Sequence, residues 1–539
     1  MTSAPVDVPR SMPRASRRGV LVGAAAVGAA ATLPALPSLA EASVALVLPP
    51  VRPYIATPVP DVTTRHMANR FAYGYTPQLG RDIKAAGGAR AWFQAQLDPA
   101  SIPDAKADAF ESWFPSRHHT PQENYQLGKA GGYAGEAQAD QARFALLRRT
   151  YSKRQVHEVM TEFWQNHLHV NGNADKQWFY RTDWDRLMRG HALGRFDEML
   201  QDAIVHPTML TYLDADLSIL NRSPKVPVEM LNENLGRELL ELHTVGRTGG
   251  YSEAQVTDSA RILTGNHVQR FTTWAYSYQP DMHVTGPVRV MGFSNLNAQR
   301  DGRPVLKDYL QYLATHPKTA ERIARKLAVR FVSDTPSDAL VAHLAAVFLA
   351  ENTDIKATLQ ALVDHPEFAQ SVGMKVRTPS EDLIQTLRVY GIQILKPTAP
   401  KDAANAIYYI SRTAGQIPFG WGPPDGFPDS GPAWSSSSRM MGSYHVHYSL
   451  AGGWYPSTGV QYRTHASWLP QPRIRFDALV DHLCRVLLGR KSTSLLLGAA
   501  CLATEQQPGN VITADTHLVK FGMPKLLGIL LDTPQHLTR

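Results

Sequence analysis

The chain has 539 residues, is 43% hydrophobic, and carries a formal charge of +8 with only two cysteines. This hydrophobic content allows a substantial core, so wholesale disorder is excluded. Two cysteines exclude a disulfide-built scaffold or a cysteine-rich metal centre, and a mild charge without a basic block argues against nucleic acid as a partner.

The first segment, residues 1–42, has the features of an export signal. Four arginines precede an uncharged Ala- and Gly-rich run over 19–40, and the AEA sequence at 40–42 fits a small-residue cleavage site. The SRRGVL sequence at 16–21 resembles a twin-arginine signal, which exports folded proteins, although Val20 stands where Phe is common. An ordinary secretory signal and an uncleaved anchor are the alternatives.

This signal predicts the location and one partner of the protein. We expect the twin-arginine export machinery as a partner, and a periplasmic, extracellular or cell-envelope location. No later apolar run approaches about 18 residues, so we expect no stable membrane span after the signal is cleaved.

Beyond the signal, helical spacing of apolar residues dominates and alternating strand patterns are scarce. The sequence therefore predicts a mainly α, multi-helix globular protein with one or two long irregular excursions rich in aromatic residues and glycine, at 266–305 (with short strands) and 415–470. Cys484 and Cys501 could be bridged or free. The expected divisions are the export signal (1–42), an extended lead-in (43–60), a helical core (61–395), an irregular aromatic, Gly- and Pro-rich segment (396–472) and a C-terminal helical segment (473–539). The expected helices are Asp82–Leu97, Gly135–Arg149, Arg154–His169, Phe196–His206, Val228–His243, Ser252–Leu263, Pro317–Val332, Ser337–Glu351, Ile355–Asp364 and Pro379–Tyr390.

One expected helix, Val228–His243, carries acids beside its buried face. Its leucines form one stripe, and Glu238 lies about 20° from Leu231 at the edge of that stripe. A carboxylate in this position must find partners or take up a proton. Arg237 points away from the leucines, so its i, i+4 pairing with Glu233 can be a simple surface ion pair.

A second expected helix, Arg154–His169, places His167 on its apolar stripe and Asn166 at the edge. A lone histidine on such a face usually bonds a core partner and does nothing else. Helical phase nevertheless allows His167 and Asn166 to meet Asn234, Glu238 and Glu241 across a helix–helix seam. Such a centre could be an acid–base pair, a metal site or a structural polar network.

Standard catalytic signatures are absent from the mature chain. His157-Glu158 begins an H-E-x-x-H motif, but position 161 is Thr, which excludes the zinc-protease motif. There is no G-x-S-x-G elbow, P-loop or dinucleotide-binding G-x-G-x-x-G, so the cofactor is unknown, a divalent metal stays open, and no metal ligand is assigned. Asp214 begins a calcium-like loop that lacks the required Gly and Glu, and is expected to cap or turn the chain.

Several of these segments together resemble the bacterial domain-of-unknown-function family numbered 1800. The resemblance spans about residues 60–440 and implies a secreted, largely helical bacterial protein, often with a twin-arginine-type start, but no settled activity. Asn266 and Val284 depart from the family pattern, which puts a role for their loop in doubt. The segments that carry it are HMANRFAYGYTP (66–77), FWQNHLHV (163–170), HPTMLTYLDADLS (206–218), NENLGRELLELHTVG (232–246), GGYSEAQVTDSARILTG (249–265), HPKTAERIARKLAVRFV (316–332) and GWGPPDGFPDSGPAW (420–434).

Three functions compete. The first is an exported hydrolase acting on an envelope or extracellular polymer, with an extracellular polysaccharide as the favoured substrate and helix-borne carboxylates as the acid and the base or nucleophile. The second is a metal- or cofactor-dependent oxidoreductase exported in its folded state, and the third is a non-catalytic envelope or assembly protein. For the hydrolase, the expected catalytic residues are Glu238, Glu241, His167 and Glu233, and the expected substrate-binding residues are Asn166, Asn234, Arg237, Asp214 and Trp434.

Overall fold

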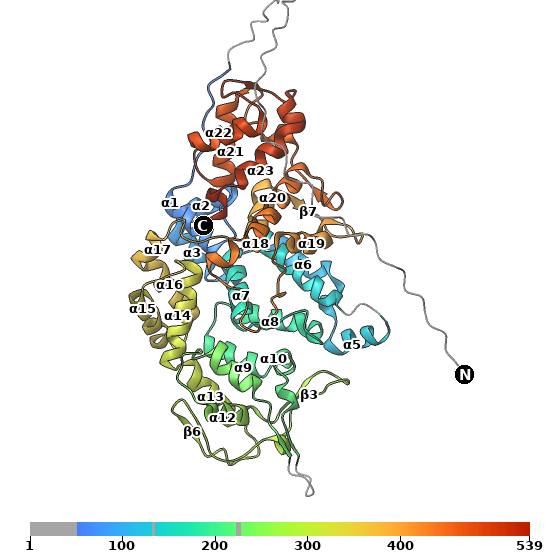
Figure 1. The fold of residues 1–539 in the computed structure, drawn as a ribbon, viewed down its shortest axis with the longest axis vertical. Coiled ribbons are helices and arrows are strands. Elements are labelled where there is room, and N and C mark those ends of the chain that lie inside the picture. Colours follow the sequence, from blue (N-terminus) through green and yellow to red (C-terminus); the bar gives the residue numbers. More distant parts are fainter. Residues whose placement is uncertain (1–50, 132–134, 222–227) are drawn as a thin grey trace, which may run out of the picture. The chain divides into compact units, whose positions relative to one another are not determined.

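The computed structural model describes residues 51–539 apart from 132–134 and 222–227, so the export signal lies outside the described residues. Helices dominate this part, and each of its sheets has only two strands (Figure 1). The mainly α prediction is confirmed. None of the helices in this part has the length and apolar content that a membrane crossing requires.

The helices and strands have the following bounds. The α-helices are α1 (Val62–Phe71), α2 (Pro77–Ala85), α3 (Ala89–Gln96), α4 (Ala105–Asp108), α5 (Pro121–Lys129), α6 (Glu136–Tyr151), α7 (Gln155–His167), α8 (Arg181–His191), α9 (Phe196–Ile204), α10 (Pro207–Tyr212), α11 (Asn234–Glu238), α12 (Glu253–Leu263), α13 (Arg303–Ala314), α14 (Pro317–Phe331), α15 (Asp338–Ala350), α16 (Ile355–Asp364), α17 (Pro366–Gln370), α18 (Pro379–Tyr390), α19 (Ala403–Ala414), α20 (Ser437–Gly452), α21 (Phe476–Leu488), α22 (Ser494–Thr504), α23 (Met523–Leu531) and α24 (Pro534–Leu537). The antiparallel strand pairs are β1 (Ile219–Asn221) with β2 (Val228–Met230), β3 (Asn266–Val268) with β4 (Tyr276–Tyr278), β5 (Val288–Val290) with β6 (Phe293–Asn295), β7 (Gln393–Ile394) with β8 (Val460–Gln461), and β9 (Ile474–Arg475) with β10 (Val511–Ile512).

Three helices begin with the same histidine–proline device. His206, His316 and His365 each precede the first proline of α10, α14 and α17, and the ring Nδ1 accepts a hydrogen bond from the backbone N–H two residues on, at 3.1, 3.1 and 3.3 Å. Proline suits the first helical position because its fixed φ is helical and its missing N–H would have had no partner there. These histidines are therefore helix caps.

The prediction of one α-helix over Val228–His243 is wrong at its start, and at its end the helix changes from α to π. Residues 228–230 form strand β2, and α11 begins only at Asn234. After Glu238 the backbone continues as a π-helix, η6 (Leu239–His243). A π-turn closes over five residues instead of four, so side chains after Glu238 do not keep the 100° spacing on which the expected stripe depended.

A glycine allows the short helix α11 to pack closely against α12. A Cβ on Gly236 would lie 2.7 Å from the backbone nitrogen of Ala260, so only glycine permits this approach. Ser259 Oγ donates a hydrogen bond to the carbonyl oxygen of Gly236 at 3.1 Å, which fixes the contact further. The end of α11 that carries Glu238 is thereby held against α12.

Apolar periodicity located most other helices closely. Helices α16 and α18 have the expected bounds, whereas the helix expected over 82–97 is two helices, α2 and α3. Gly87 and Gly88 separate them with φ of +93° and +114°, a conformation that an α-helix cannot continue. The strands expected within 266–305 are β3 to β6.

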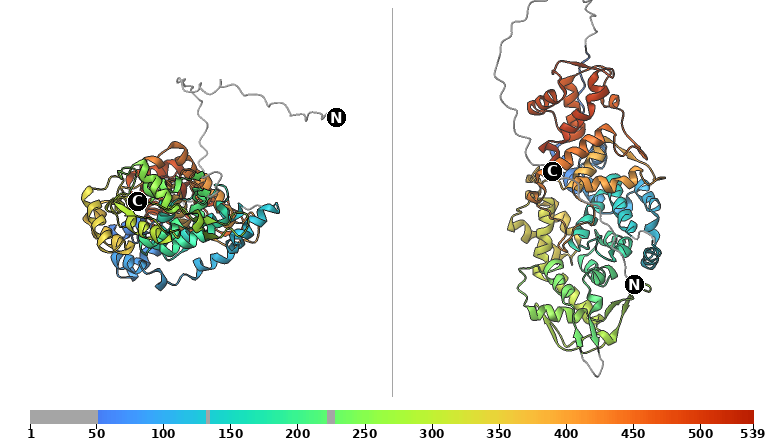
Figure 2. Two further views of the ribbon diagram at one scale, coloured as in Figure 1. Left: turned by 90° about the horizontal axis from the view of Figure 1, so that it is seen from below. Right: turned by 45° about the vertical axis from the view of Figure 1, so that its right-hand side comes forward.

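The segment 396–472 is more helical than its composition suggested, because it contains α19 and α20. Helix α20 packs against α18 and α23, and α23 packs against α22 (Figures 1 and 2). Tertiary packing therefore orders a stretch whose serines and glycines favour turns. Cys484 and Cys501, on α21 and α22, are both free thiols.

Candidate active-site cleft

Residues 420–434, which we call the motif loop, are held against the C-terminal end of α7. Asn166 Nδ2 donates to the carbonyl oxygen of Phe427 at 2.7 Å, and Asn166 Oδ1 accepts from the Phe427 backbone N–H at 2.6 Å. His169 Nε2 lies 2.9 Å from the carbonyl oxygen of Trp421. The amide of Asn166, expected to bind substrate, is thus committed to the motif loop.

A glycine and a tryptophan complete the seating of this loop. Gly426 has φ +78°, and a Cβ there would lie 2.1 Å from the carbonyl oxygen of Asn166. Trp434 is 8% exposed, and its Nε1 donates to the carbonyl oxygen of Pro428 at 2.8 Å. The ring of Trp434, expected to stack on substrate, is instead part of the packing that supports the loop.

A buried ion network lies behind the loop. Arg330 on α14 lies 3.0 Å from Glu381, 3.3 Å from Asp429 and 3.8 Å from Glu162. Arg149 reaches Glu162 at 2.9 Å. Only about 40 Å³ of space is left among these side chains, so this region braces the motif loop rather than offering room for a substrate.

On the other side of the loop, a cleft of about 370 Å³ lies between the motif loop and α14. Trp421, Asp425 and Lys326 are among the residues that line it. Burial, and after it the charge of Arg322, lower the pKa of Lys326 to about 8, against the opposing charges of Asp429 and Asp425. The cleft therefore combines a cation, a carboxylate and an aromatic ring.

Glu238, at the end of α11, is half-buried and incompletely bonded. Its Oε2 is shielded from solvent and has no hydrogen-bond partner among the described residues. Burial raises its pKa above 4.5, Glu241 and Asp425 raise it further, and Arg247 and Arg237 oppose them. Glu238 is thus a partly desolvated acid, and its pKa responds to the charge of the loop acid Asp425.

His167 marks the point where α7 meets the π-helix. It is 1% exposed, and its Nε2 lies 3.1 Å from the carbonyl oxygen of His243. Burial, followed by the charge of Lys326, holds the pKa of His167 well below 6.5, so the ring is neutral. His167 therefore contacts η6, but in the described residues its hydrogen-bond partner is a backbone carbonyl, and neither His167 nor Asn166 bonds Asn234, Glu238 or Glu241 as expected.

Two of the other expected site residues form a surface ion pair. Arg237 reaches Glu253 through two hydrogen bonds of 3.0 and 2.6 Å, and it lies 3.5 Å from Glu233. Glu233 accepts a hydrogen bond from Thr257 Oγ1 at 2.6 Å. These contacts fasten α11 to α12, which leaves Arg237 and Glu233 with structural partners.

The remaining expected residues have other partners or face solvent. Glu241 pairs with Arg247 at 2.5 Å, and Asn234 is exposed at the start of α11. Asp214 adopts φ +52° and lies 3.0 Å from Arg270, as expected of a turn residue. Asp214 therefore has a partner of its own outside the cleft.

Sequence reasoning missed Asp425 and Lys326. Asp425 lies in an irregular loop, where no periodicity indicates which way a side chain points. Lys326 is one of several basic residues on α14, and only the seating of the motif loop over that helix distinguishes it. The signal available was the co-occurrence of both residues in motif segments.

These features define a mainly helical protein with a cleft lined by carboxylate, lysine and tryptophan side chains. The chain belongs to the family described as Protein of unknown function (DUF1800), whose model matches residues 66–538. No curated protein and no solved structure matches it.

Proposed function

We propose that this protein is an exported hydrolase that acts on an envelope or extracellular polymer, with a glycan as the first substrate class to test. The observation that carries the proposal is Glu238, a half-buried carboxyl with a raised pKa and one unpartnered oxygen. An acid of raised pKa keeps its proton to higher pH, which is the state that a general acid requires.

Glu238 and Asp425 supply the two carboxylates of this proposal. Glu238 donates its proton to the oxygen of the leaving group, and Asp425 serves as the base or the nucleophile. Trp421 Nε1 donates to Asp425 Oδ1 at 2.9 Å, which orients this acid. The two carboxyls come from different elements, which suits a bond cleaved between them better than Glu238 and Glu241 on neighbouring turns.

The other groups bind or position. Lys326 holds an anionic or strongly polar group of the substrate, and Trp421 offers an aromatic surface at the cleft. His167 is a positioning residue, because its ring holds the carbonyl end of η6 and hence the helix that carries Glu238.

Export is the second part of the proposal. It rests on the arginine pair at 17–18 and the small-residue site at 40–42. Changing both arginines to lysine is expected to trap the precursor in the cytoplasm, as measured by fractionation and immunoblotting. A precursor that is still exported would contradict use of the twin-arginine route.

The activity test is a screen of a glycan library with the wild-type protein and with Glu238→Gln. We expect turnover by the wild type and a loss of about 10²-fold or more in the variant, the usual contribution of a general acid. Glu198→Gln is the matched control, because Glu198 is an exposed acid on α9. Equal turnover by Glu238→Gln and the wild type would overturn the role of Glu238 as the general acid. The absence of turnover with every library member would overturn the proposal that the protein hydrolyses glycans.

A further inference from the structure

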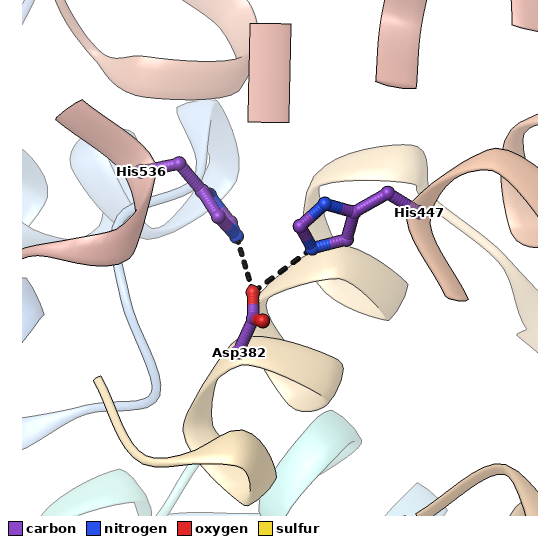
Figure 3. A group of neighbouring side chains, drawn as sticks. All are labelled: Asp382, His447 and His536. Carbon is purple, nitrogen blue, oxygen red and sulfur yellow. Dashed lines mark hydrogen bonds and ion pairs between the residues drawn. The ribbon is translucent and has the colours of Figure 1, made fainter. Parts of the chain in front are cut away.

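A second polar cluster lies among α18, α20 and α24, apart from the cleft residues. Figure 3 shows that Asp382, His447 and His536 point toward one another from these three helices. Asp382 Oδ1 lies 3.0 Å from His447 Nε2 and 2.7 Å from His536 Nε2. All three side chains are buried, with at most 3% of each residue exposed.

The spacing of these atoms suits a metal ion. The three potential ligand atoms lie within 4.8 Å of one another, and among the described residues this is the one group of three or more His, Cys, Asp or Glu side chains with that property. Tetrahedral zinc, with bonds of about 2.0–2.2 Å, keeps its ligand atoms about 3.3 Å apart. A small outward shift of the three side chains would therefore accommodate the ion.

Surrounding groups orient the cluster as they do around known metal sites. His447 Nδ1 bonds Asp532 Oδ1 at 2.6 Å, so a carboxylate fixes the ring and directs Nε2 inward. Ser443 Oγ donates to Asp382 Oδ2, and Arg439 lies 3.3 Å from that same oxygen. The second oxygen of Asp382 is thus occupied, which leaves Oδ1 facing the two histidines.

Tyr390 provides an independent observation. Its hydroxyl is buried and has no hydrogen-bond partner among the described residues. Tyr390 lies about two turns from Asp382 on α18, and burial together with the charges of Asp532 and Asp382 raises the pKa of its hydroxyl. A buried hydroxyl without a partner is costly, and this is the kind of cost that a bound water or ligand removes.

We propose that Asp382 Oδ1, His447 Nε2 and His536 Nε2 bind a divalent transition metal, zinc or iron(II), both of which two imidazoles and one carboxylate ligate, with a further position open to water. Three protein ligands and an open position are typical of catalytic metal sites, but the burial of all three side chains keeps a polymer away from the metal, so its role here is structural. It would tie the short C-terminal helix α24 to α18 and α20. Binding requires both Nε2 atoms to be free of protons: His447 keeps its Nδ1 proton toward Asp532 and releases the Nε2 proton to solvent, while the neutral His536 ring carries its single proton on Nδ1.

The same contacts also describe a metal-free network in which both ring nitrogens donate to Asp382. Metal analysis of untagged protein, purified without chelators after export from its native host, separates the two. We expect about one metal ion per chain, as in structural zinc sites, and its loss in His447→Gln and His536→Gln. His66→Gln is the matched control, because His66 is a buried histidine that bonds a backbone carbonyl, that of Phe368, at 2.8 Å.

Cobalt substitution keeps the test decisive if a variant fails to fold. Wild-type protein stripped of metal and loaded with Co²⁺ should give the visible absorption of a tetrahedral nitrogen- and oxygen-ligated site, and its Tm should rise. His536→Cys should retain binding with a shifted spectrum, because a thiolate also ligates. Wild-type protein without stoichiometric metal, and without a cobalt spectrum after loading, would overturn the proposal in favour of the proton-linked network.

Discussion

Glu238 at the end of α11 and Asp382 on α18 are both withdrawn from bulk water, but their surroundings differ. Asp382 has His447, His536, Ser443 and Arg439 as partners, whereas one oxygen of Glu238 has none among the described residues. A fully partnered buried charge stabilises a particular arrangement of helices, while an unpartnered one keeps capacity for chemistry. Removal of the two acids should therefore have different effects: loss of stability at Asp382 and loss of chemistry at Glu238.

The largest effect is expected at Asp382. Asp382→Ala leaves Arg439 and the two histidines without their common partner, and breaking a buried ionic contact of this kind costs about 3–5 kcal/mol. The free energy of unfolding measured by denaturant titration should fall by that amount. The matched control is Asp364→Ala, which removes an exposed pair with Arg90 and should cost no more than about 1 kcal/mol. Equal losses in the two variants would mean that burial does not distinguish these acids.

The next effect concerns activity at the cleft. Asp425→Asn removes the second carboxylate but keeps the size of the side chain, so turnover should fall about 10²-fold while Tm changes little. Asp338→Asn, at an acid whose side chain is 91% exposed on α15, is the control. If turnover on the same substrate survives in Asp425→Asn, the second carboxylate must be sought elsewhere, beginning with Glu241.

The seating of the motif loop gives a third, smaller effect. Gly426 and Gly373 share nearly the same backbone conformation, φ +78° and +77°, but a Cβ on Gly426 meets the Asn166 carbonyl at 2.1 Å, whereas one on Gly373 meets nothing within 4 Å. Alanine at either position is destabilised by the left-handed backbone, and Gly426→Ala should cost about 1–3 kcal/mol more because of the overlap. Denaturant titration of both variants measures that difference. Equal stabilities would show that the loop can move away from α7 at no cost.

The two regions also differ in how far the sequence predicted them. The apolar spacing of α16 and α18 was sufficient to locate both helices, because apolar residues that recur about every 3.6 residues lie on one face only in an α-helix. Glu238 was identified for the same reason. Strand β2 and the π-helix η6, however, change the helical spacing from which a contact between Glu238 and His167 was expected. The Asp382 cluster was missed because His447 lies 65 and His536 154 residues from Asp382 along the chain, and only the packing of three helices brings them together.

The smallest expected effect is the pH dependence of stability at Glu238. Its folded-state pKa lies above 4.5, so the group favours the folded state below its unfolded pKa and loses that contribution as the pH rises through the folded value. Glu238→Gln has no such loss. The difference in Tm between variant and wild type should therefore increase from pH 4 to pH 7, and its free-energy equivalent should stay under about 1 kcal/mol because the side chain is partly screened by solvent. A difference that is constant across this range would mean that Glu238 is an ordinary surface acid, and the contrast with Asp382 would then reduce to burial alone.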